Sequence, residues 1–161
     1  MLNTAAATET LVDCLCESSG TAEILMRDMS MPDSVAGSCL CGAVRFEAQL
    51  PSLWCAHCHC TQCQRFHGAP LVTWVGFNED DVSFTVGENR VTWYSSSAPA
   101  QRGFCGACGS SFLFRSERWP GELHISLTNL HGPIDREPEA HVFYDSHVPW
   151  LELGDELPKK L

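Results

Sequence analysis

The segment that organises the chain spans residues 54–65 and reads Trp-Cys-Ala-His-Cys-His-Cys-Thr-Gln-Cys-Gln-Arg. It holds four thiols and two imidazoles, which is more than packing alone requires. Zinc binds thiolate sulfur at about 2.3 Å in a tetrahedron, so its ligands must converge within a few ångströms. The Cys-x-Cys-x-x-Cys spacing lets one bend of the backbone achieve this. We therefore interpret Cys58, Cys60 and Cys63 as three ligands of one zinc ion.

Two cysteine pairs flank this segment, Cys39 with Cys41 upstream and Cys105 with Cys108 downstream. The partition that breaks no cluster assigns both pairs to a second metal. Four cysteines that close a site are typical of structural zinc, which adds folding free energy. Three protein ligands with a vacant fourth position are typical of catalytic zinc. The sequence thus predicts two zinc ions per chain, one structural and one catalytic.

Three neighbouring side chains offer alternative fourth ligands for the central site. Cys58 and Cys60 share a face in an extended chain, whereas Cys55, at an odd offset from Cys58, points to the other side. His57 and His59 alternate with the cysteines and face away by the same parity. Because an irregular loop breaks this parity, a closed and purely structural second site stays open as an alternative.

Composition favours an intracellular metalloprotein. The chain has 161 residues, of which 44% are hydrophobic, enough for one domain with an ordinary core. No basic start followed by an apolar run marks a secretory signal. In a reducing compartment clustered cysteines are metal ligands rather than disulfides, so we expect a cytoplasmic protein. Cys14 and Cys16, in a weakly helical stretch without other ligands nearby, are expected to be free thiols.

The charge narrows the class of partner. A net charge of -10, with basic residues scattered along the chain, argues against nucleic-acid binding, which relies on neutralising phosphates. No apolar run approaches the roughly 18 residues of a membrane span. A small-molecule partner is the class that remains.

The distribution of residue types divides the chain into two segments. Residues 1–36 are small and acidic, and we expect an extension that is partly helical or disordered. Residues 37–161 show period-two alternation between turn residues, which is typical of a mostly β, antiparallel domain. The expected strands are residues 44–48, 71–77, 82–86, 91–94, 111–114, 123–127 and 141–144.

The ligand set of the central site indicates its chemistry. Zinc on three thiolates carries net negative charge and is a weaker Lewis acid than zinc on three histidines, so it is poorly suited to making hydroxide. A thiol is a better fourth ligand, because soft sulfur suits the site and metal binding deprotonates it. We expect a site that activates a small thiol beside an electrophile.

These motifs together resemble a known family. Gly-Ser-Cys-Leu-Cys-Gly-Ala-Val-Arg-Phe at 37–46, Cys-His-Cys-Thr-Gln-Cys at 58–63 and Phe-Cys-Gly-Ala-Cys-Gly at 104–109 are similar to the ordered signatures of the glutathione-dependent formaldehyde-activating enzyme (GFA) family, which includes the centromere protein V-like proteins. Residues 141–150 resemble its closing stretch. Cys55, the acidic extension and Gln64, where a basic residue is common, depart from the pattern.

The resemblance implies a mostly β, Mss4-like (β-tent) fold of short antiparallel sheets with two zinc sites. It also implies a carbon–sulfur lyase that joins glutathione and formaldehyde into S-hydroxymethylglutathione, with the same division of the seven cysteines. Arg65 and Arg102 are candidates for binding a glutathione carboxylate. His59 and His67 are candidates for moving the hemithioacetal proton. The alternatives are the same chemistry on another small thiol or electrophile, and a zinc-stabilised binding module without catalysis.

Overall fold

The computed structural model describes residues 32–161 of the chain. Cys14, Cys16 and most of the expected extension lie outside this range. The described residues form strands β1 Ser34–Ser38, β2 Arg45–Gln49, β3 Trp54–Cys58, β4 Val72–Asn78, β5 Val82–Val86, β6 Val91–Ser97, β7 Ala100–Cys105, β8 Ser111–Ser116, β9 Glu122–Ser126 and β10 His141–Val142, helix α1 Thr61–His67, and 3-10 turns at Glu79–Asp81, Glu88–Arg90, Leu127–Asn129 and Tyr144–Ser146.

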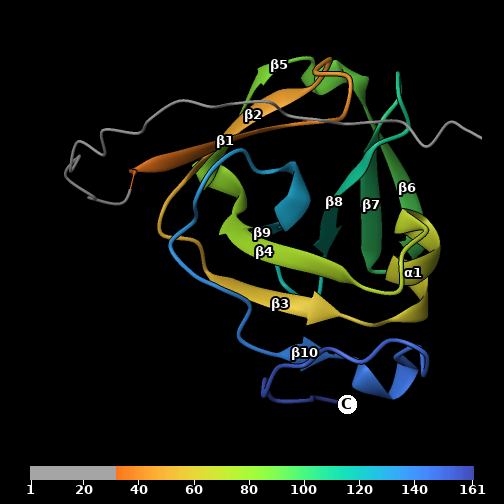
Figure 1. Cartoon of the computed structure of the whole chain (residues 1–161). Coiled ribbons are helices and arrows are strands. Elements are labelled where there is room, and N and C mark those ends of the chain that lie inside the picture. Colours follow the sequence, from red (N-terminus) through yellow and green to blue (C-terminus); the bar gives the residue numbers. More distant parts are fainter. Residues whose placement is uncertain (1–31) are drawn as a thin grey trace, which may run out of the picture.

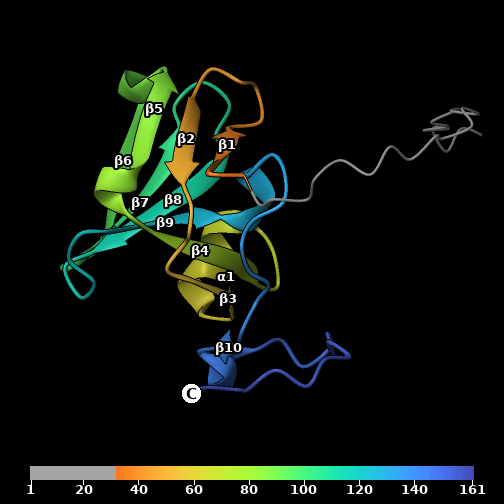
Figure 2. The same ribbon diagram turned by 90° about the vertical axis from the view of Figure 1, so that its left-hand side faces the viewer.

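The strands form two sheets (Figure 1). The smaller sheet has the order β1-β2-β5, and the larger has the order β10-β3-β4-β9-β8-β7-β6. All neighbours pair antiparallel except β10, which runs parallel to β3. Figure 2 shows β10 and the C-terminal segment at the opposite end of the domain from the smaller sheet. The C-terminal segment therefore extends the β3 edge of the larger sheet.

The main core lies between the two sheets. Phe46 of β2 stacks on Phe112 of β8 with ring centroids 5.8 Å apart. Val35 of β1 and Phe77 of β4 belong to the same buried cluster. A Cβ at Gly37 would meet the Phe46 ring at 2.3 Å, so β1 crosses this ring where no side chain fits. Burial of these apolar side chains holds the sheets face to face.

The other face of the larger sheet carries a different set of side chains. Alternate residues of a strand point to opposite faces, so Leu123 and Ile125 of β9 enter the main core while His124 lies on the far side. In β4 the same alternation places Val75 in the core and Trp74 on the far side. This second face forms one wall of the cavity described below.

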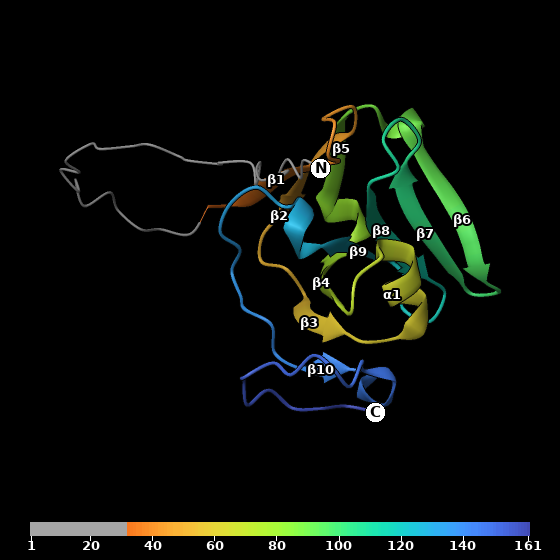
Figure 3. The same ribbon diagram turned by 45° about the vertical axis from the view of Figure 1, so that its right-hand side comes forward.

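Helix α1 lies against this second face, beside β3 and β7 in Figure 3. Its N-cap is Cys60, whose sulfur accepts a hydrogen bond from the Cys63 backbone N–H at 3.3 Å. It ends at Gly68, which takes the left-handed conformation at φ 62° and bonds to the Gln64 carbonyl. Phe66 packs edge-on against Phe104 of β7 and fixes the helix to the sheet. Two of the central cysteines are thus held by the first turn of a short helix.

The expectation of a mostly β domain is confirmed, and the expected strands lie within a few residues of β2, β4, β5, β6, β8 and β9. The segment 141–144 forms a two-residue strand followed by a 3-10 turn. Strands β1, β3 and β7 and helix α1 were not expected. No helix within residues 32–161 has the length and apolar character to span a membrane.

We expect Gly76→Ala to destabilise the domain. Gly76 of β4 pairs with Trp54 of β3, and a Cβ at Gly76 would lie 2.4 Å from the indole. The displaced ring would lower the free energy of unfolding by about 1–3 kcal/mol. Denaturant unfolding measures this, and Gly154→Ala, where a Cβ meets open space, is the control. Equal stability of the two variants would contradict the close contact between strand and indole.

Candidate metal centres and the adjoining cavity

The first sulfur cluster brings together Cys39, Cys41, Cys105 and Cys108, whose Sγ atoms lie within 4.8 Å of one another. Cys39 and Cys41 lie in a tight turn after β1, where Gly42 takes φ 70° and its N–H bonds to the Cys39 carbonyl at 3.0 Å. Of the other pair, Cys105 ends β7 and Cys108 lies in the turn between β7 and β8. The cluster thus links the smaller sheet to the larger one.

The second sulfur cluster consists of Cys58, Cys60 and Cys63, again within 4.8 Å of one another. Cys58 ends β3, Cys60 caps α1, and Cys63 lies within the helix. The Cys58 and Cys63 sulfurs are 3.6 Å apart. Two sulfurs on one tetrahedral zinc ion are separated by about 3.8 Å, given the zinc–sulfur distance. The spacing and the donor type both fit zinc.

Crowding of the three central thiols opposes their simultaneous deprotonation. Hydrogen bonds with Cys60 and Cys63, together with burial, raise the pKa of the Cys58 thiol. Hydrogen bonds from Cys58 and Cys63 lower the pKa of the Cys60 thiol. Three thiolates this close repel one another, so they need a cation among them to coexist. In the first cluster, a backbone hydrogen bond from Ser110 lowers the pKa of the Cys108 thiol to about 6.

The alternative fourth ligands lie elsewhere. Cys55 belongs to the main core cluster, whereas Cys58 belongs to the separate buried cluster around Trp74. Burial raises the pKa of the Cys55 thiol to about 11. The His57 Nδ1 atom lies 2.8 Å from the Thr73 hydroxyl. None of these side chains, nor His59, joins the three-sulfur cluster in residues 32–161. All eight cysteines of this range are free thiols.

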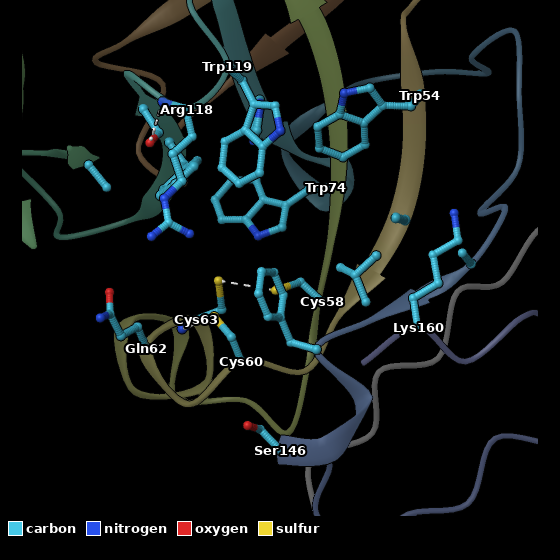
Figure 4. Close-up of a pocket in the computed structure, with 18 of the residues that line it drawn as sticks. Trp54, Cys58, Cys60, Gln62, Cys63, Trp74, Arg118, Trp119, Ser146 and Lys160 are labelled. Atoms are coloured by element: carbon cyan, nitrogen blue, oxygen red, sulfur yellow. Dashed lines mark hydrogen bonds between the residues drawn. The ribbon is translucent and has the colours of Figure 1, made fainter. Parts of the chain in front are cut away.

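A cavity of about 770 Å³ opens beside the second cluster. Figure 4 shows Cys58, Cys60 and Cys63 facing Trp74 and Trp119 across it. Its walls are formed by strands β3, β4, β6, β7, β8 and β9, the start of α1 and the C-terminal segment. The aromatic members of the lining are Trp54, Trp74, Phe114, Trp119, His124 and Phe143, and the charged members are Arg102, Arg118, Glu139 and Lys160. The three cysteines of the second cluster and Cys55 also belong to it.

Arg102 is the buried cation of this cavity. Its side chain leaves only 5% of the residue exposed. Nη1 lies 3.4 Å from the Cys63 sulfur and Nη2 lies 3.4 Å from Oε1, the side-chain amide oxygen of Gln62. The guanidinium also lies over the Phe114 ring, 4.9 Å from its centroid. Its Nε atom is buried without a hydrogen-bond partner. Arg102 thus places positive charge against the sulfur cluster.

A chain of side chains fastens the cluster loop to the C-terminal segment. The His59 Nε2 atom lies 2.8 Å from His141 Nδ1, and His141 Nε2 lies 2.9 Å from an Asp155 carboxylate oxygen. Gln64 donates to the backbone carbonyl oxygens of His59 and Ser146, at 2.6 and 2.9 Å. The glutamine that departs from the resemblance therefore braces the loop rather than presenting a charge.

The structure separates the other candidate residues from the cavity. Arg65 is exposed on α1 and does not line the cavity, whereas Arg102 does. His59 and His67 are also absent from its lining, and burial lowers the pKa of His67 to about 4.

Sequence reasoning missed His124, which is buried in the cavity wall with its Nε2 atom 3.1 Å from a Glu122 carboxylate oxygen. Desolvation lowers the pKa of His124 to about 4, so its ring is neutral at physiological pH. The alternation Leu123-His124-Ile125 within the expected strand 123–127 is the signal that could have placed His124 on the face opposite the core.

Comparisons with known proteins agree with this geometry. Residues 34–146 match the family model described as glutathione-dependent formaldehyde-activating enzyme. A Halomonas elongata protein that provisionally bears the same name is 27% identical over 124 residues, covering 73% of this chain and 79% of that protein. An uncharacterized lyase of Schizosaccharomyces pombe is 36% identical over 81 residues, covering 48% of this chain and 55% of that protein.

A solved structure shares the fold. The crystal structure of a Rhodobacter sphaeroides protein superposes with a TM-score of 0.53 at 25% identity, covering 62% of this chain and 91% of that chain. The family model spans most of the described residues, including both sulfur clusters. This chain belongs to the glutathione-dependent formaldehyde-activating enzyme family.

Proposed function

We propose that the chain is a zinc-dependent enzyme of the carbon–sulfur lyase type, which joins glutathione or a related small thiol to formaldehyde or a similar electrophile. The observation that carries this proposal is the three-sulfur cluster at the wall of a large cavity. A purely structural site has no need of such an opening, whereas a catalytic one requires room for a substrate. The family name of the relatives supports the same substrates.

The two clusters are assigned different roles. Cys39, Cys41, Cys105 and Cys108 would hold a structural zinc ion, and Cys58, Cys60 and Cys63 would hold a catalytic one. The bound ion would supply a position at which a substrate thiol loses its proton and is held as a thiolate. The protein side chains then have three tasks: to neutralise the added negative charge, to orient the thiol, and to exclude water.

Arg102 performs the first task. A fourth thiolate beside three cysteine thiolates adds negative charge to a buried place, and the guanidinium 3.4 Å from Cys63 offsets it. The Phe114 ring beneath the guanidinium and the burial of Arg102 hold the charge in position. Because Arg102 is held at the cluster, it interacts with the sulfurs. The glutathione carboxylates would then bind to more exposed cations.

Arg118 and Lys160 are those cations. Both are exposed and line the cavity, and Figure 4 shows them on opposite sides of the three cysteines. They suit the two carboxylates of glutathione. The exposed Glu139, which also pairs with Arg136 at 3.2 Å, suits its ammonium group. Anchoring the tripeptide at these points would orient its sulfur toward the cluster. The thiolate then adds to the carbonyl carbon, a carbon–sulfur bond forms, and the carbonyl oxygen takes up a proton from water.

The first test is exchange NMR spectroscopy of glutathione with formaldehyde, with and without the protein. We expect the protein to accelerate interconversion of the free reactants and S-hydroxymethylglutathione, because positioning removes much of the entropic barrier. Cys60→Ser should abolish the acceleration while the fold is kept. If neither glutathione nor any other small thiol reacts faster, the chain is better described as a zinc-stabilised binding module.

Zinc content distinguishes the two clusters. We expect two zinc ions per chain by elemental analysis, and one in either Cys60→Ser or Cys105→Ser. Cys105→Ser, which loses the structural ion, should also have a much lower melting temperature, because the free energy of zinc binding at that site contributes to folding. Cys60→Ser should melt near the temperature of the wild type. Cys55→Ala, outside both clusters, should keep both ions. Equal unfolding of the two serine variants would contradict the division of roles.

Removing the charge of Arg102 should slow the reaction without removing zinc. We expect Arg102→Met to lower kcat/KM by about 10–100-fold, because a buried countercharge to the thiolates is lost. The matched control is Arg115→Met: Arg115 also lies over an aromatic ring, Trp93, but does not line the cavity. Similar losses in both variants, or none in either, would argue against a role for Arg102 at the cluster.

A further inference from the structure

The cavity beside the second cluster is more aromatic than glutathione and formaldehyde require. Its volume of about 770 Å³ lies within the range of pockets that hold drug-sized ligands, and glutathione would fill part of it. Formaldehyde, with one carbon and one oxygen atom, has no apolar surface to set against the aromatic part of the lining. The inference that follows rests on the function proposed above and concerns the electrophile.

The aromatic side chains of the cavity form one continuous wall. Trp74 contacts Phe114 with ring centroids 6.1 Å apart, and Phe114 contacts Trp119 at 6.2 Å. His124 lies between them, 5.2 Å from Phe114 and 5.6 Å from Trp119, and Trp54 meets His124 edge-on at 4.5 Å. This wall stands on strands β3, β4, β8 and β9 and the turn after β8, all on the face of the larger sheet that is turned away from the main core.

Two aromatic residues of the lining are not buried by packing. Trp119 keeps 38% of its surface exposed and Phe143, on the C-terminal segment, keeps 42%. The aromatic residues of the main core, such as Phe46 and Phe112, are at most 1% exposed. Exposed rings that line the same cavity offer apolar surface to a ligand, and the core gains nothing from them.

The charged residues of the cavity lining have other partners or roles than the aromatic wall. Arg118, Lys160 and Glu139 are exposed charges that suit the ends of glutathione, and Arg102 is committed to Cys63 and Gln62. Figure 4 shows Trp54, Trp74 and Trp119 together on the side facing the cysteines. The wall therefore has no counterpart in a polar tripeptide, and the remaining reactant is the group that fits it.

We propose that the electrophile of this enzyme is an aldehyde that carries an aromatic group, whose ring packs against the wall of Trp54, Trp74, Phe114 and Trp119. The thiolate of glutathione adds to the carbonyl carbon and forms the carbon–sulfur bond. The π electrons of the carbonyl pass to its oxygen, which gains the proton that the thiol released to solvent. The product is a hemithioacetal, and no oxidant or reductant is consumed.

The experiment compares three aldehydes with glutathione and the zinc-loaded full chain: formaldehyde, propanal and phenylacetaldehyde. We expect kcat/KM for phenylacetaldehyde to exceed that for propanal at least about tenfold, as burial of a ring against aromatic surface allows. Trp119→Ala should reduce this ratio about tenfold, and Trp119→Leu, which keeps apolar bulk, should reduce it less. Trp150→Ala is the control, because Trp150 is 73% exposed and lies outside the cavity lining.

A second measurement needs no variant. The unreactive 2-phenylethanol should inhibit the wild-type reaction with formaldehyde competitively, and 1-propanol at the same concentration should not. Two outcomes would overturn the aromatic specificity and leave the proposed function standing. In the first, the protein accelerates the reaction with formaldehyde, but kcat/KM for phenylacetaldehyde is no higher than that for propanal. In the second, the ratio of these two kcat/KM values is unchanged in both Trp119 variants. Absence of acceleration with all three aldehydes would overturn both.

Discussion

Mutual repulsion among closely spaced sulfurs is the constraint on which this structure depends. Four cysteines meet where the turn after β1 faces the turn between β7 and β8, and three more meet where β3 passes into α1. Such groups are stable as thiolates only around a cation. The first group joins the two sheets at the edge of their shared core, to which Cys39 and Cys105 belong, and the second determines where a short helix begins. The architecture is therefore built around two places that apolar packing alone would not stabilise.

The larger sheet serves two purposes because its strands alternate. Val75, Leu123 and Ile125 fill the space between the sheets, and their neighbours in sequence, Trp74 and His124, turn to the cavity. A strand that is buried on one face and lines a pocket on the other lets the rigid core position the functional side chains. Arg102 gains its place at Cys63 in this way, from a strand rather than from a mobile loop.

Much of this arrangement follows from the sequence, and the exceptions have physical reasons. The spacing of the cysteines predicts both groupings, and alternation predicts most strands. Strand β7 was not predicted because Ala-Gln-Arg-Gly-Phe-Cys has small and polar residues on both faces, so hydrophobic and polar residues do not alternate along it. Helix α1 is too short for a helical period to show. The cavity is lined by residues from six strands, β3, β4, β6, β7, β8 and β9, and from the C-terminal segment, so its lining could be identified only once the register of the sheet was known. The sequence marks Arg102 only as a candidate for a glutathione carboxylate, and its contact with Cys63, 39 positions away, became visible only in the structure.

The link from His59 to His141 joins residues 82 positions apart, and it has a consequence for how the chain matures. On the ribosome the central cysteines emerge well before the segment that will brace their loop. Until β10 docks beside β3, these thiols lack the C-terminal segment as a neighbour. Contacts between residues so far apart in sequence form slowly. The second cluster therefore reaches its final surroundings only after residues 141–155 have been synthesised and have docked beside β3. The four cysteines of the first cluster, in contrast, are all present once residue 108 has been made.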